Sequence, residues 1–412
     1  MNKKIDERIP REVGKGALLE HPAIKTPWEK LISFHDAYHY IHKHIAMLDA
    51  DFMQVLRIVV PDYEDRANRL CSNIKVNAEA IYNSPYGEHA CDTHHVHPFM
   101  CGNFMGGLLG DAGDERLLMC GRVNDFGTYR VEKELDVCYW DIVGSEFCRT
   151  TVVGLENQGI GMSRSVNQSG GNLDYAMVEA KGCGDLHCRI VAEDRNKYPM
   201  PEHKVWQSFG PIATADQIKF TPEEECLTES MIFRAECGYH YTGGTCQEEY
   251  TADSYTSSVP TCLAGYYMES VFQEAISKGE ITDEKLNHIV TCVFEACGKN
   301  MFRDFYAVKG LREWLGVPNN VDDGRVLGAY IEMICQMVRC EYEIEAFNKE
   351  EVVLNIDRNA ITYYMPRMAV AYKALWNGMV KTLVGTQWFC WEEDSQEGKL
   401  RIKIAKKIDK FC

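Results

Sequence analysis

Segments with helical spacing and segments with strand-like alternation fall into separate blocks of this chain, and this order constrains its fold most. Apolar residues recur at helical spacing over 26–48, 61–83, 263–279, 282–299, 326–347 and 366–385. Alternation typical of half-buried strands occupies 128–140 and 149–156, and hairpins are predicted over 174–195 and 387–408. The blocks predict an α+β protein in which helices pack on small antiparallel sheets.

The 412 residues exceed the roughly 250–300 at which a single core stops growing, so two structural halves are expected. We predict an N-terminal helical segment over 1–60, a first α+β half over 61–210, and a second, mostly helical half over 211–412. Both halves run from helices to a cysteine-bearing hairpin. This shared order indicates either two degenerate copies of one domain or a chance likeness in element order.

The charge and hydropathy of the chain exclude several classes of partner. Its formal net charge of -17 repels phosphate backbones and anionic lipid, so neither nucleic acid nor a membrane surface is expected as a partner. The opening residues lack the apolar region of a signal peptide, and no apolar run approaches the roughly 20 residues of a membrane span. We therefore expect a cytoplasmic protein, with a homo-oligomer left open.

The chain is cysteine-rich, with 18 cysteines and no C-x-x-C motif. So many thiols without an export signal indicate a reducing compartment, and an anaerobic source fits their abundance. The closest pairs are Cys183/Cys188, Cys292/Cys297 and Cys335/Cys340. Because residues i and i+5 lie on different faces of a helix, we predict that the last two pairs are buried apolar side chains.

The densest group of chemically active residues lies between Glu88 and His97. Asp92, His94, His95 and His97 offer the carboxylate and imidazoles that manganese, zinc or iron recruit. One or two further ligands would come from elsewhere, with His187, His39 and Glu193 available. The spacing matches no named metal motif, and the alternative is a polar loop whose histidines cap helices. We interpret the segment as a divalent-metal site.

A second group of such residues, GCGDLHC, surrounds the turn of the first predicted hairpin. Its candidate catalytic residues are Cys183, Asp185, His187 and Cys188. The thiol of Cys183 with the imidazole of His187 would make a nucleophile with its base, or the group would complete the metal site. The alternative is a hairpin tip whose cysteines pack inward.

A tyrosine- and glycine-rich stretch supplies candidate substrate contacts. Tyr239, His240 and Tyr241 precede a Gly-Gly pair, which is typical of a loop that closes over a ligand. No phosphate-binding loop motif and no G-x-G-x-x-G occurs, so a nucleotide cofactor is not expected.

The line AKGCGDLHCRIVAEDR, with the strands before it, resembles the small ligand-binding domain of the vinyl-reductase and aminothiazoline-carboxylate hydrolase-like families. The resemblance covers at most residues 115–195 and, more weakly, the last hundred residues. It implies a pocket for a small, often cyclic molecule, and a hydrolase-like member would open a ring. The histidine segment upstream departs from the family pattern, and no catalytic residue is carried over.

Two functions follow as hypotheses. The first is a metal-dependent hydrolase that opens a small cyclic substrate at an amide-like C–N bond or a cyclic-diketone C–C bond. The second is a non-catalytic protein that binds a small aromatic or other apolar ligand between its halves, with the histidines only shaping the pocket.

Overall fold

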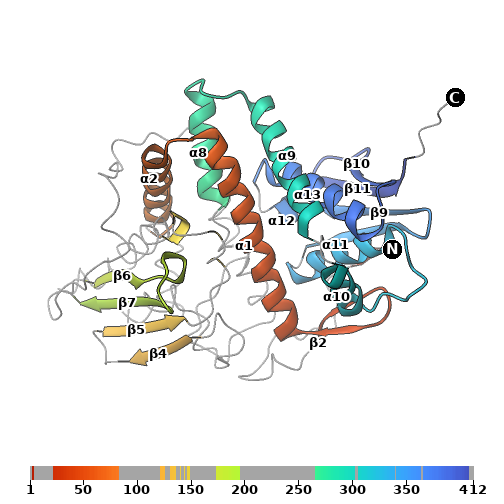
Figure 1. Ribbon diagram of the computed structural model, residues 1–412, viewed down its shortest axis with the longest axis horizontal. Helices are drawn as coiled ribbons and strands as arrows, with labels where there is room; N and C mark the ends of the chain where they lie inside the picture. Colours follow the sequence, from red (N-terminus) through yellow and green to blue (C-terminus); the bar gives the residue numbers. More distant parts are fainter. Residues whose placement is uncertain are drawn as a thin grey trace. The chain divides into compact units, whose positions relative to one another are not determined.

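The structure is a computed structural model of the chain (Figure 1). It divides into two compact units. The residues it describes are 2–3, 22–82, 121–125, 130–135, 140, 143, 146–148, 173–194, 265–301, 305–338, 340–362 and 365–407. Unit 1 comprises 1–10, 20–37 and 281–412, and unit 2 comprises 11–19 and 38–280. Helices and small antiparallel sheets build the described parts, so the predicted α+β class is confirmed. The predicted three-part division and the duplication stay predictions.

Unit 1 contains a five-stranded antiparallel sheet of order β1-β8-β9-β11-β10. In that order its strands are β1 (Asn2–Lys3), β8 (Tyr342–Phe347), β9 (Glu351–Asp357), β11 (Lys399–Lys406) and β10 (Trp388–Glu392). Leu400, Ile402 and Ile404 of β11 are fully buried, so their alternation faces the core as predicted. The pairing of β10 with β11 confirms the predicted C-terminal hairpin.

Several described helices of unit 1 contribute fully buried aromatic side chains to its core. The described helices of this unit are α9 (Asp283–Met301), α10 (Phe305–Leu315), α11 (Arg325–Met337), α12 (Arg358–Thr362) and α13 (Met368–Leu383). The rings of Tyr372 and Trp376 are fully buried and stack at a centroid distance of 4.8 Å. Thr282 caps α9 as predicted, because its Oγ1 accepts the Lys285 N–H at 3.3 Å.

The helix predicted to begin at Thr26 is wrong in its start. Residues 22–33 form a hairpin of β2 (Pro22–Lys25) and β3 (Leu31–Ser33), and helix α1 runs from Phe34 to Val59. The Thr26 hydroxyl accepts the Lys30 N–H at 3.2 Å, so it closes this turn. The helix cap is Ser33, whose Oγ accepts the Asp36 N–H at 3.1 Å.

Unit 2 holds α1 from Tyr38 onward, α2 (Tyr63–Tyr82), α8 (Gly265–Ser277) and a four-stranded antiparallel sheet. The sheet has the order β4-β5-β7-β6, with β4 (Gly121–Asp125), β5 (Arg130–Leu135), β7 (Cys188–Asp194) and β6 (Leu173–Glu179). Phe52 of α1 meets Phe272 of α8 at a ring distance of 6.4 Å. Across the described parts of both units, no helix combines the length and apolar character needed to cross a bilayer.

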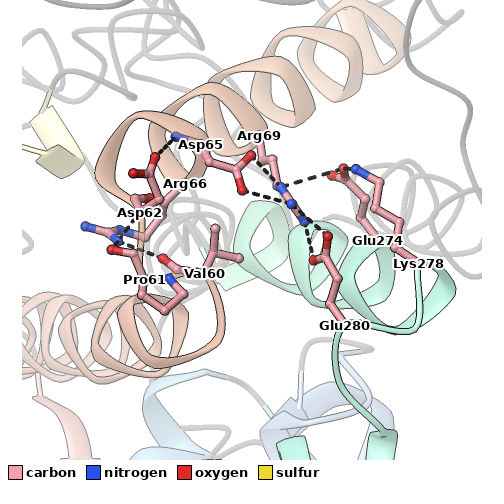
Figure 2. A network of polar contacts seen from close by, with 9 residues as sticks. All are labelled: Val60, Pro61, Asp62, Asp65, Arg66, Arg69, Glu274, Lys278 and Glu280. Atoms are coloured by element: carbon pink, nitrogen blue, oxygen red, sulfur yellow. Dashed lines mark hydrogen bonds and ion pairs between the residues drawn. The ribbon is translucent and has the colours of Figure 1, made fainter.

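Two arginines on α2 connect this helix to other parts of unit 2: Arg66 to the end of α1, and Arg69 to the residues after α8 (Figure 2). The buried guanidinium of Arg66 donates to the carbonyls of Val60 and Pro61 at 2.7 and 3.0 Å, which satisfies acceptors at the end of α1. Arg69 forms paired hydrogen bonds to Asp65, both at 2.9 Å, and to Glu280, at 2.6 and 2.9 Å. Arg69 therefore ties α2 to the residues that follow α8.

Replacing Arg69 with methionine is expected to lower the free energy of unfolding of unit 2 by about 1 kcal/mol at neutral pH, since networked surface pairs contribute about that much. The hydrogen bond from Arg69 holds the pKa of Glu280 below its ordinary value of 4.5. The stabilisation of unit 2 by the Arg69–Glu280 pair is therefore present above pH 4.5 and is lost as the pH falls through the lower pKa of Glu280 in the folded state. Urea unfolding of wild type and variant should show a difference in stability at pH 7 that shrinks as the pH falls below 4.5; a difference that stays the same in acid would contradict the assignment.

Candidate functional site

The hairpin predicted around GCGDLHC is confirmed, and a short helical turn forms its tip. Strand β6 leads into a 3-10 turn over Lys181–Cys183, and the chain returns through β7. Gly184 has a φ of +99°, which a residue with a side chain adopts only under strain, so the turn requires glycine there. The N–H of Cys183 donates to the Ala180 carbonyl at 2.9 Å, which closes the turn.

Two of the four predicted catalytic residues make contacts that hold this turn. Asp185 Oδ2 accepts the Ala180 N–H at 2.9 Å, so one of its carboxylate oxygens bridges the ends of the turn. Cys188 is buried, and its sulfur accepts the Lys181 N–H at 3.4 Å. Val178 of β6 and Val191 of β7 form a small buried cluster within the hairpin. The turn is therefore fixed by contacts from both sides.

His187 and Glu179 form an imidazole–carboxylate pair at the base of the turn. Nε2 of His187 lies 2.7 Å from Oε2 of Glu179, and both side chains are partly exposed, at 28% and 21%. Arg189 lies opposite Glu179 in the strand register, and its Nη2 is 3.5 Å from Glu179 Oε1. The Glu179 carboxylate thus faces two nitrogen-bearing side chains.

The contact with Glu179 determines which nitrogen of His187 does chemistry. Since a carboxylate only accepts hydrogen bonds, Nε2 carries the proton and Nδ1 is the nitrogen with the free electron pair. A carboxylate that orients an imidazole in this way supports either a general base or a metal ligand. Cys183 is exposed at the tip and in no disulfide, so a thiol lies in the same turn.

The other predicted site residues lie outside the described part of the chain. These are the metal ligands Asp92, His94, His95 and His97 and the substrate contacts Tyr239, His240 and Tyr241. Their assignments stay predictions. Within the described residues, no group of three or more His, Cys, Asp or Glu side chains is arranged to hold a metal ion.

Glu179 is the site residue that reading the sequence missed. It stands three residues before GCGDLHC begins and therefore outside the motif, so the motif alone did not select it. The signal lies in the hairpin itself: Val178 and Val191 face inward, and a bulge between Met177 and Glu179 brings Glu179 opposite Arg189. A strand alignment across the turn would have brought the carboxylate to the imidazole.

Comparison with family models, with curated proteins and with solved structures finds no match for this chain. The family resemblance of the hairpin therefore stays a prediction. The function must be argued from the site's own chemistry.

Proposed function

We propose that this protein is a metal-dependent hydrolase that opens a small cyclic substrate, in which His187 transfers the proton and Glu179 orients it. The observation that carries the proposal is the 2.7 Å contact between His187 and Glu179 on a partly exposed hairpin. A histidine fixed by a carboxylate is a common general base, and such a group contributes about 10²–10⁴-fold to a rate. The bond opened is an amide-like C–N bond or a cyclic-diketone C–C bond.

The chemistry of the proposal balances around His187. Nδ1 takes a proton from the attacking water, whose oxygen forms a bond to the ring carbonyl carbon. The ring C–N or C–C bond then breaks, and the same proton passes from Nδ1 to the departing nitrogen or carbon. Water has then been added across the broken bond, and His187 is neutral again.

The divalent metal of the proposal would be manganese, zinc or iron, held by Asp92, His94, His95 and His97. Bound there, it would lower the pKa of a water molecule and polarise the substrate carbonyl. Within the hairpin the carboxylate of Asp185 keeps the turn closed, so proton transfer is assigned to His187.

The first test counts metal in the purified full-length chain, wild type beside a His95→Ala/His97→Ala double variant. The proposal expects about one metal ion per chain in the wild type and its loss in the double variant. Metal absent from both would overturn the hydrolase and favour a non-catalytic protein for a small apolar ligand.

The second test measures turnover of a panel of cyclic imides, lactams and cyclic 1,3-diketones. His187→Gln keeps an N–H donor for Glu179 but takes up no proton, so turnover should fall about a hundredfold with the metal retained. Glu179→Gln should reduce it about tenfold, because the imidazole loses its orienting charge. His288→Gln, which removes an exposed imidazole from α9 in unit 1, is the matched control and should leave turnover unchanged. Equal rates in wild type and His187→Gln would refute the assigned role.

A further inference from the structure

Two cysteines of unit 1, Cys335 and Cys340, meet where helix α11 ends. The helix ends at Met337 with Val338 as its C-cap, and the Cys340 N–H donates to the Cys335 carbonyl at 2.9 Å. A hydrogen bond that returns from the second residue after the cap to the last helical turn is the mark of a Schellman motif. A contact between the side chains at these two positions frequently accompanies the motif, and here both side chains are thiols.

The same spacing inside a continuous helix has the opposite result. Cys292 and Cys297 are also five residues apart, but α9 runs unbroken through both of them. Five residues turn a helix by about 140° beyond a full turn, so these two thiols point to different sides. Cys292 is exposed, with its sulfur 3.7 Å from Nε2 of His288, and Cys297 is half-buried.

Cys335 and Cys340 lie in a buried environment that disfavours the thiolate form of Cys340. Both are buried, and the Cys335 side chain lies near enough to act on the Cys340 thiol. Burial and the Cys335 side chain raise the pKa of Cys340 well above its ordinary value. The Cys340 sulfur also lies 3.5 Å from the carbonyl oxygen of Asp357, at the end of β9. The pair is therefore held close, and attack by outside reagents is slow.

We propose that Cys335 and Cys340 form a dithiol site that low-molecular-weight disulfides, such as glutathione disulfide, oxidise to an intramolecular disulfide. One protein thiolate attacks the reagent, forms a mixed disulfide and releases one reagent thiol. The second protein thiol loses its proton and attacks the protein sulfur of that mixed disulfide, which forms the Cys335–Cys340 bond and releases the second reagent thiol. The protein loses two protons and two electrons, and the reagent becomes two thiols.

Oxidation changes the contacts at the end of β9. The bridge fastens the end of α11 to the residues that lead into β8, and it removes the S–H with which Cys340 donates to Asp357. A redox change at α11 is thereby transmitted to the junction between β9 and α12.

The test treats the native full-length chain with glutathione disulfide, alkylates the remaining thiols and digests with trypsin. Trypsin cleaves after Arg339, between the two cysteines, so the bridge joins peptide 326–339 to peptide 340–349. We expect this joined pair to form, two hydrogens lighter than the separate peptides and without alkylation. Cys292 and Cys297 share peptide 286–299, which should carry glutathione or the alkylating group and no internal bridge.

A Cys340→Ser variant checks the origin of the joined peptides, which should disappear from it. Recovery of Cys335 and Cys340 as thiols at equilibrium, with Cys292 fully converted in the same sample, would overturn the proposal. So would a joined pair that forms only in denaturant, or an internal bridge in peptide 286–299 to the same extent.

Discussion

Replacing Gly298 with alanine is expected to lower the free energy of unfolding of unit 1 by about 3 kcal/mol, the upper part of the range for overpacking a core. A Cβ added at Gly298 would lie 2.1 Å from the Leu375 carbonyl oxygen and 2.9 Å from the Met379 amide nitrogen. Both are backbone atoms of α13, so no side chain can rotate away. The two helices would have to separate.

Each of the two helices presents a glycine to the backbone of the other, so a small shift of either helix would not remove the clash. A Cβ at Gly378 of α13 would lie 2.3 Å from the Glu295 carbonyl oxygen of α9. Separating the helices also loosens the core to which both contribute fully buried side chains, Phe294 from α9 and Trp376 from α13. The cost therefore includes lost packing as well as the clash.

The matched control is Gly310→Ala on α10. Among the described residues no atom lies within 4 Å of a Cβ built at Gly310, which is exposed in the helix interior. Alanine is a better helix former there by about 0.5–1 kcal/mol, so this change should stabilise unit 1. Urea unfolding of both variants measures the two effects. Equal effects of the same sign would show that α9 and α13 do not meet at these glycines.

Much of the fold follows from local patterns. The helices at 63–82, 265–277, 283–301 and 368–383 and the hairpins ending at Asp194 and Lys406 all lie where spacing and turn residues predict them. In each of these segments the propensity of the residues and the pattern of burial agree. Sequence alone located both glycines within helices, but it did not show that they face each other.

The secondary-structure predictions fail where one sequence pattern is compatible with both a helix and a strand. Residues 326–347 are predicted as one helix, yet α11 ends at Met337 and β8 begins at Tyr342. The pair Cys335/Cys340, read as unaligned, is brought together by that same chain reversal. The predicted burial of Cys292/Cys297 is wrong for Cys292, which is exposed on its helix. Residues 342–347 form strand β8 because they pair with β9, and this long-range pairing is not visible in the local sequence pattern.

The candidate site was predictable as far as it is local. The turn residues identify the hairpin and place His187 on it, because glycine and aspartate at these positions fix the turn. The Glu179 contact depends on a strand register and a bulge, which no local motif encodes.

The stability of unit 2 is expected to fall steeply in mild acid because of His44. This residue of α1 is buried, and burial lowers the pKa of its imidazole from 6.5 to about 3. Between these values the unfolded chain binds a proton at this site and the folded chain does not. With respect to His44, unit 2 therefore has its full stability above pH 6.5, and this stability is lost as the pH falls towards 3.

The free energy of unfolding of unit 2 is expected to fall by about 1.4 kcal/mol for each pH unit and by about 5 kcal/mol over the whole interval. Most carboxylates titrate below about pH 4.5, so the slope between about pH 6 and pH 5 isolates histidine. Urea unfolding across that interval should show a smaller slope in His44→Gln than in the wild type. His288→Gln is the matched control for removing an imidazole from an exposed helix face. Identical slopes in wild type and His44→Gln would mean that His44 takes up its proton as readily in the folded chain, so α1 would not bury it.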